Sequence, residues 1–136
     1  LFRIADALGV ERIYLTGSSP APPSSKLRKT SRATEKHVPF SQAPDPLPIL
    51  RELQASGYRI ISLELTSASI DIRKLVVGAS DRVCLVLGSE NVGVSQALLD
   101  ISEQTVHVPM RGQHSSMNVA TACAIATFEI TKAFCA

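Results

Sequence analysis

Residues 82–102 read RVCLVLGSENVGVSQALLDIS, and they contain three structural signals in succession. The run Val83–Leu87 is continuously apolar between Asp81 and Gly88, a pattern typical of a strand buried on both faces of a sheet. A loop with two glycines follows, and residues 94–102 then have the pattern of a short helix. A strand that is followed directly by a helix is the repeating unit of α/β proteins.

Strands and helices alternate on both sides of this stretch as well. The patterns predict, in chain order, a helix over 1–8, a strand over 12–17, a long loop over 17–44, a helix over 45–57, a strand over 58–65, an irregular segment or short helix over 66–75, a strand over 105–109 and a helix from about Ser116 to Ala133. The sequence therefore predicts an α/β domain with a mainly parallel sheet and helices on both faces. Such sheets bind ligands beyond the carboxyl ends of their strands, so we expect the functional site in the loops after Leu15, Leu65, Leu87 and Val108.

The composition is that of one globular domain. The chain has 136 residues, of which 45% are hydrophobic and 19% are charged, so it is long enough for a core and too apolar for a disordered chain. No apolar run approaches the roughly 18–20 residues that span a bilayer, and no secretory leader is recognisable, so we expect no membrane partner. The three cysteines lack metal-ligand spacing, and Cys84 and Cys123 sit inside apolar runs. They predict buried thiols in a reducing cytoplasm and no metal site.

The stretch GQHSSMNVATACAIATFEI, residues 112–130, turns abruptly from polar to apolar. Its polar residues are bunched at the entrance of the predicted final helix. Helix capping explains this, because Ser and Asn side chains accept bonds from the unpaired N–H groups of a first turn. An active site at the start of the helix also explains it, and this stretch alone leaves both interpretations open.

Two loops have residues suited to ligand binding. In GSENVGVS, residues 88–95, Gly88 and Gly93 can take positive φ and let a ligand approach the backbone. An ordinary strand-to-helix turn, with Ser95 as the helix cap, has about the same weight. The loop has neither the Lys-Ser/Thr pair of a P-loop nor a GxGxxG fingerprint. In the loop PMRGQHSSMN, Arg111 either binds phosphate or faces water.

The long predicted loop carries concentrated positive charge. Residues 26–36 hold five basic side chains against one acid, although the net charge of the whole chain is only +2. A basic loop of this kind can hold a phosphate backbone, and a solvated loop is the alternative. The basic residues are Lys26, Arg28, Lys29, Arg32 and Lys36.

Several of these segments together resemble the signature motifs of the SpoU/TrmH family of RNA ribose 2′-O-methyltransferases. LVLGSENVGVSQALL and VHVPMRGQHSSMNVATACAIATFEI are similar to the second and third motifs of that family. RIADALGVERIYLTG resembles the second half of its first motif, and KTSRATEKHVPF resembles the stretch that follows. The resemblance covers nearly the whole chain, in the same order and at similar spacing.

The resemblance implies an α/β fold whose C-terminal segment forms a deep trefoil knot, against the usual rule that chains do not thread loops. In this family the knot builds the site for S-adenosylmethionine (SAM), which becomes S-adenosylhomocysteine in the reaction. Carried over to this chain, the walls of the SAM site would be Leu65, Thr66, Gly88, Ser89, Glu90, Gly93, Val108, Met110, Ser116, Met117 and Asn118. The polar start of the final helix would then both cap the helix and face the cofactor.

The reaction implied by the resemblance is methylation of a ribose 2′-hydroxyl in structured RNA, either tRNA or rRNA. A neutral hydroxyl is a weak nucleophile, so loss of its proton and in-line placement determine the rate. The key arginine of the family corresponds to Arg3. Guanidinium stays protonated at ordinary pH, so we expect Arg3 to clamp a phosphate and stabilise the oxyanion rather than act as a general base. Ser116 and Asn118 would orient the ribose or Arg3, and Glu90 would hold its loop or a second subunit.

The first motif of the family reads Asn-x-Gly-x-x-x-Arg, so its Asn and Gly would precede residue 1. We therefore expect residues 1–136 to form a single catalytic domain that lacks the first strand and the start of motif one. The resemblance implies a cytoplasmic homodimer that associates through the knot region and binds RNA through the basic loop and Arg111. The alternatives are an inactive RNA- or SAM-binding homologue and a generic nucleotide-binding α/β module.

Overall fold

The computed structural model of the chain describes residues 9–16, 39–88, 93–112 and 117–134. These residues belong to two compact units, Leu1–Ile49 and Leu50–Ala136. The helix predicted over 1–8 lies outside the described residues, as does most of the predicted long loop.

The first unit contains a pair of parallel strands. β1 (Ile13–Thr16) pairs with β2 (Phe40–Ala43), and Arg12 Nη1 donates to Ser41 Oγ at 2.7 Å across the pair. β1 confirms the strand predicted over 12–17. β2 lies inside the predicted loop, so that prediction is wrong there, because the sequence FSQA has neither an apolar run nor the alternation of a strand.

The helix α3 (Pro46–Ala55) begins and ends where the sequence predicts. Asp45 Oδ1 accepts the Leu47 N–H at 3.0 Å, which satisfies one of the unpaired donors of the first turn. Gly57 follows the helix with φ of 93°, a backbone conformation that favours glycine.

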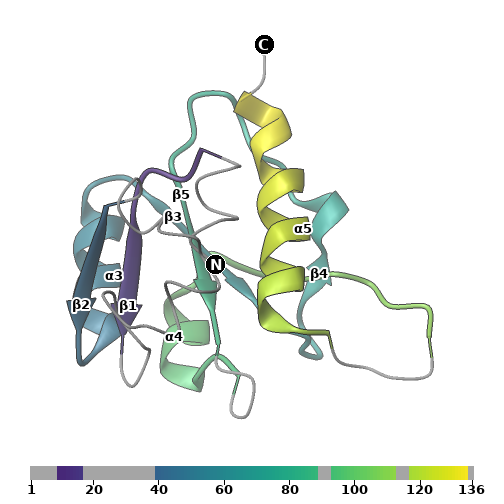
Figure 1. Cartoon of the computed structure of the whole chain (residues 1–136), viewed down its shortest axis with the longest axis horizontal. Coiled ribbons are helices and arrows are strands. Elements are labelled where there is room, and N and C mark those ends of the chain that lie inside the picture. Colours follow the sequence, from purple (N-terminus) through teal and green to yellow (C-terminus); the bar gives the residue numbers. More distant parts are fainter. Residues whose placement is uncertain (1–8, 17–38, 89–92, 113–116, 135–136) are drawn as a thin grey trace, which may run out of the picture. The chain divides into compact units, whose positions relative to one another are not determined.

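The second unit contains a four-stranded, wholly parallel sheet in the order β4-β6-β3-β5 (Figure 1). Its elements, in chain order, are β3 (Arg59–Leu63), β4 (Ile70–Asp71), the 3₁₀ helix η2 (Ile72–Lys74), β5 (Val83–Leu87), α4 (Gln96–Ile101), β6 (Gln104–His107), α5 (Val119–Thr131) and the 3₁₀ helix η3 (Lys132–Phe134). The predicted strands and helices of this region are confirmed. β4 and η2 resolve the segment that the sequence left as irregular or helical.

Helices cover both faces of this sheet, as predicted. Ile60 and Ile61 are both fully buried, and as neighbours on β3 they point to opposite faces. Ile61 packs under α5, the yellow helix of Figure 1, in a cluster with Ile72, Val106, Ala126 and Ile130. Ile60 packs on the side of α3 and α4, in a cluster with Leu50, Val86 and Val94.

The most buried strand is β3 rather than β5. Among the described strands β5 lies at an edge of the sheet, and of its residues only Val86 is buried. In β3 even Ser62 is fully buried, where its hydroxyl bonds to Ser102 Oγ at 2.6 Å. An apolar run thus indicates a core strand without indicating its position in the sheet.

The two described cysteines are shielded, as predicted. Cys84 on β5 is half-buried and Cys123 on α5 is buried. Burial raises the pKa of the Cys84 thiol to about 11 and also raises the pKa of the Cys123 thiol. Both side chains therefore remain neutral thiols near neutral pH.

Candidate active site

The loops that follow β3, β5 and β6 leave the same edge of the sheet. The three strands are parallel neighbours, so their carboxyl ends meet at one edge. The described residues from the predicted cofactor site all lie in these loops or at the start of α5. They are Leu65, Thr66, Gly88, Gly93, Val108, Met110, Met117 and Asn118.

The loop after β5 is pinched where it begins and ends. A Cβ atom on Gly88 would lie 2.1 Å from the carbonyl carbon of Gly93 and 2.4 Å from the backbone nitrogen of Val94. Such contacts leave room for glycine alone. The sequence predicted that glycine would let a ligand approach the backbone here, whereas the group that approaches Gly88 is the end of its own loop.

Gly93 is restricted for two separate reasons. Its φ is 74°, which disfavours any residue with a side chain. In addition, a Cβ atom would lie 2.2 Å from Oε2 of Glu64. The close packing at this edge therefore involves a carboxylate from β3 as well as the loop backbone.

Glu64 is a site residue that the sequence analysis missed. It follows β3 directly, and its Oε2 accepts the Val94 N–H at 2.8 Å. Its own backbone N–H donates to the Val106 carbonyl at 2.9 Å. The available signal was its position, an acidic residue directly after the apolar strand YRIISL.

The loop after β3 forms a closed turn between Thr66 and Ser69. Ser69 Oγ donates to the Thr66 carbonyl at 2.8 Å and accepts the Thr66 N–H at 3.0 Å. The same hydroxyl lies 2.9 Å from Nδ1 of His107, at the end of β6. The direction of this hydrogen bond depends on the tautomer of His107. Ser69 and His107 thus fix the turn that carries Thr66, and the sequence analysis assigned neither of them to the site.

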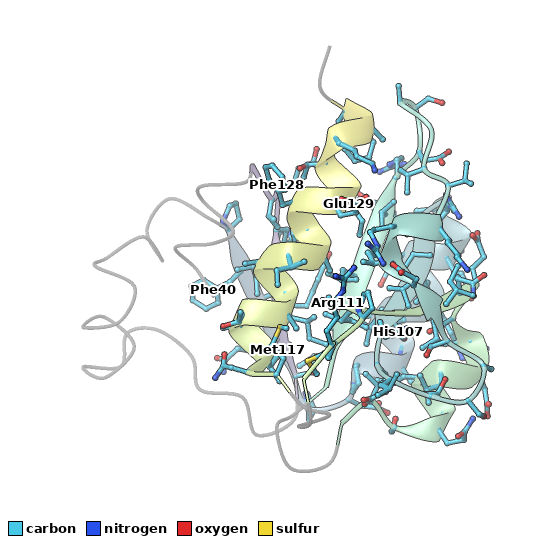
Figure 2. The ribbon with its side chains drawn as sticks, turned by 90° about the vertical axis from the view of Figure 1, so that its right-hand side faces the viewer. Phe40, His107, Arg111, Met117, Phe128 and Glu129 are labelled. Carbon is cyan, nitrogen blue, oxygen red and sulfur yellow. The ribbon has the colours of Figure 1, made fainter. Side chains whose placement is uncertain are left out.

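The final helix begins three residues later than predicted, with Asn118 as its N-cap. Asn118 Oδ1 accepts the Ala120 N–H at 2.9 Å and the Thr121 N–H at 3.3 Å. The capping interpretation of this polar cluster is therefore confirmed for Asn118. Figure 2 shows Met117 where the chain enters α5, and His107 and Arg111 where it leaves β6.

Apolar residues at this edge differ in exposure. Leu65 is 57% exposed, whereas Met110 and Met117 are half-buried. Val108 packs against the core cluster beneath α5, so it supports the fold as well as the edge. Arg111 is exposed, which is compatible with both of its predicted interpretations.

Several predicted site residues lie outside the described residues. They are the catalytic candidates Arg3 and Ser116, the loop residues Ser89 and Glu90, and the basic residues Lys26, Arg28, Lys29, Arg32 and Lys36. Their predicted roles stay predictions.

A groove of about 280 Å³ lies away from this edge, between the segment after η2 and the end of α5. It is lined by Ile72, Leu75, Val76, Val77, Glu129, Ile130, Lys132 and Ala133. Figure 2 shows Glu129 and the exposed Phe128 on opposite sides of the helix. None of the lining residues belongs to the predicted site.

The described part of the chain contains no group of three or more His, Cys, Asp and Glu side chains placed to hold a metal ion. Within the same residues, the helices are too short or too polar to cross a bilayer.

Three known proteins indicate what this chain is similar to. It is 32% identical over 136 residues to an uncharacterized tRNA/rRNA methyltransferase of Mycobacterium tuberculosis, covering 97% of the chain and 46% of that protein. It is 27% identical over 130 residues to the 23S rRNA (guanosine(2553)-2′-O)-methyltransferase RlmP of Bacillus subtilis, covering 96% and 51%. The crystal structure of an AdoMet-bound rRNA methyltransferase from Sinorhizobium meliloti superposes with a TM-score of 0.90 at 26% identity, covering 99% of the chain and 51% of that protein.

The chain spans about half the length of the curated relatives that it matches. The family model of the SpoU rRNA methylases matches residues 1–128. This match includes the pinched loop after β5, the end of β6 and most of α5. The chain therefore belongs to the SpoU rRNA methylase family.

Proposed function

We propose that this chain is the catalytic domain of a SAM-dependent methyltransferase that modifies a ribose 2′-hydroxyl in tRNA or rRNA. The observation that carries the proposal is the convergence of three parallel-strand exits on one edge, where the loop after β5 is closed on its own backbone. Family membership supports RNA methylation. The 2′-hydroxyl as acceptor is supported by the name of a relative that is 27% identical.

The residues of this edge are chemically suited to SAM. The exposed Leu65 and the half-buried Met110 and Met117 offer apolar surface for the adenine and for the carbon groups around the sulfonium of the molecule. The turn at Thr66 and the start of α5 offer backbone and side-chain polar groups for its ribose and amino-acid part. When bound, SAM would supply a methyl group on a positively charged sulfur.

The chain's own residues would position the acceptor and stabilise its charge. Arg3 would bind the phosphate beside the target ribose and stabilise the oxygen as it loses its proton, a role suited to a group that stays protonated. Ser116 and Asn118 would orient the ribose or Arg3. Glu90 would hold the loop after β5 or contact a second subunit.

RNA would be held by positive charge. The five cations of residues 26–36 provide phosphate contacts, and the exposed Arg111 would add one beside the cofactor loops. A tRNA or rRNA substrate would place the protein in the cytoplasm.

We also propose the assembly that the family resemblance implies. Residues 1–136 would form one catalytic domain that lacks the first strand and the start of motif one, and its C-terminal segment would form a deep trefoil knot. Two copies would associate through the knot region and bring Arg3 of one subunit close to the site of the other. Sedimentation of the protein as a monomer at all concentrations would contradict this assembly.

The proposed function is tested first by calorimetric titration with SAM and S-adenosylhomocysteine. We expect saturable binding of both. Incubation with radiolabelled SAM and unmodified tRNA or rRNA transcripts should then label RNA, and nucleoside analysis should recover a 2′-O-methylated nucleoside. A transcript with 2′-deoxyribose at the modified position should accept no label.

Each result has a separate meaning. SAM binding without RNA labelling by the full-length protein would favour the inactive SAM-binding homologue. Labelling that persists on the 2′-deoxy transcript would contradict the ribose 2′-hydroxyl as acceptor. A folded full-length protein that binds neither SAM nor its product would overturn the proposed function.

A further inference from the structure

Glu64 joins the exits of three neighbouring strands. It directly follows β3, and its backbone N–H donates to the carbonyl of Val106 on β6 at 2.9 Å. Its side chain reaches toward the other neighbour, where Oε2 accepts the N–H of Val94, beyond β5, at 2.8 Å. One residue therefore ties the segments after β3 and β5 to the strand β6.

The carboxylate and the loop after β5 fit each other closely. A Cβ atom on Gly93 would lie 2.2 Å from Glu64 Oε2, so an added methyl group would force the carboxylate to move. Oε1 of the same carboxylate lies 3.2 Å from the Leu65 N–H, so the second oxygen is also held. A carboxylate that accepts two backbone N–H groups makes charge-assisted bonds, which are stronger than bonds between neutral groups.

We propose that Glu64 is a positioning residue for the cofactor loop. Its carboxylate fixes the end of the loop at Gly93 and Val94, which follow directly on the segment assigned to SAM. This inference rests on the proposed function, because the loop it positions is the one assigned to SAM. It adds a residue that lies outside the segments that carry the family resemblance.

The contact with the Val94 N–H requires an acceptor atom at this reach, and the charge strengthens it. Glu64→Gln keeps one side-chain oxygen at the same reach and removes the charge, whereas Glu64→Ala removes the acceptor and leaves the Val94 N–H without its partner. We therefore expect Glu64→Ala to weaken SAM binding about tenfold and Glu64→Gln to stay within about threefold of the wild type. A change in KM for SAM that is larger than the change in kcat would match a positioning role.

A double-mutant cycle with Gly93 tests the contact itself. Gly93→Ala introduces both a positive-φ penalty and a clash with Glu64, so it should weaken SAM binding strongly in the wild type. In the Glu64→Ala background the clash is gone, and the additional effect of Gly93→Ala should be at least threefold smaller. Gly57→Ala is the matched control, since its φ is 93° and no atom lies within 4 Å of the added Cβ. It should leave SAM binding unchanged.

The experiment is calorimetry of SAM with the full-length protein and these variants, with thermal unfolding of each variant in parallel. A wild type that fails to bind SAM overturns the proposed function. A wild type that binds, with Glu64→Ala binding equally well, overturns the positioning role alone. Loss of binding in Glu64→Gln as large as in Glu64→Ala, or independent effects in the cycle, would also overturn it. If Glu64→Ala does not fold, Glu64→Asp replaces it in both tests, because the shorter side chain withdraws the carboxylate from Gly93 and Val94 and should give the same weakening and the same coupling.

Discussion

The two edges of the parallel sheet are held together in different ways. At the amino edge, the guanidinium of Arg59 on β3 donates to Glu103 Oε2, to Asp81 Oδ2 at 3.0 Å and to the Val76 carbonyl at 2.8 Å. At the carboxyl edge, the backbone at Gly88 lies close to that of Gly93 and Val94, and the Glu64 carboxylate accepts two backbone N–H groups. Bonds between two flexible charged side chains adjust to small shifts, whereas contacts with backbone atoms do so less. The difference indicates that the amino edge serves stability and the carboxyl edge serves accurate placement.

Gly88→Ala should give the largest effect, because the added methyl group would meet backbone atoms at 2.1 Å. Overpacking of this kind costs about 3 kcal/mol, and we expect this loss in the free energy of unfolding together with loss of SAM binding. Urea unfolding and SAM titration measure the two effects. Gly112→Ala is the control at the same edge, since no atom of the described residues lies within 4 Å of its added Cβ. Equal free energies of unfolding and equal SAM affinities of the two variants would contradict the rigidity of this edge.

Arg59→Met should destabilise the protein by about 2 kcal/mol, because it removes several charge-assisted bonds from a side chain that is only 23% exposed. SAM affinity of the folded variant should stay the same. Urea unfolding at low and high salt provides the measurement, and the difference from wild type should shrink at high salt. Arg73→Met is the control, since its side chain is 62% exposed in a local pair with Asp71. A loss of SAM affinity in Arg59→Met would mean that the two edges are coupled.

Asn118→Ala should cost about 1 kcal/mol of stability, because it removes the cap of α5. Asn118→Ser restores a capping oxygen, so thermal unfolding should return close to that of the wild type. SAM affinity should remain weakened in both variants if the amide also contacts the cofactor. If Asn118→Ser restores both stability and SAM affinity, Asn118 acts only as the cap of the helix.

Acid should lower the stability of both edges slightly, because each edge contains one aspartate with a lowered pKa. The Arg73 side chain and backbone lower the pKa of Asp71, at the carboxyl end of β4, from 3.8 to about 2. At the amino edge, the Gly78 N–H, and then Arg59, lower the pKa of Asp81. Because both folded-state values are depressed, their stabilisation is present above pH 4 and is lost as pH falls toward 2. Urea midpoints between pH 5 and pH 2 should therefore converge for wild type and Asp71→Asn. A difference that is constant over this range would contradict the assignment.

Most of the second unit was predictable from the sequence because its elements have clear limits. The run Val83–Leu87, for example, ends at a glycine. β2 was missed because its four residues pair with β1 across a long intervening segment. The predicted start of α5 was three residues too early, because Ser and Asn are both good helix caps and the sequence offers Ser116 as well as Asn118. The backbone geometry selects Asn118.

The candidate site was predictable as a set of loops but not as a set of contacts. The motif residues identified the loops, and parallel topology brings the described ones to one edge. Strand register determines the site roles of Glu64, Ser69 and His107, so these roles could not be predicted. The register places Leu63 beside both Leu87 and Val106, so that the residue after Leu63 reaches both neighbouring segments. No local pattern in the sequence reports such an alignment.

The thiols of Cys84 and Cys123 can be used to measure local opening of the fold. Cys84 belongs to the layer of α3 and α4, and Cys123 belongs to the helix on the opposite face of the sheet. Opening of the surrounding layer and formation of the thiolate speed the reaction of each one with a thiol reagent. Mass-spectrometric labelling rates, compared peptide by peptide, would thus time the opening of the two layers separately, without any introduced probe.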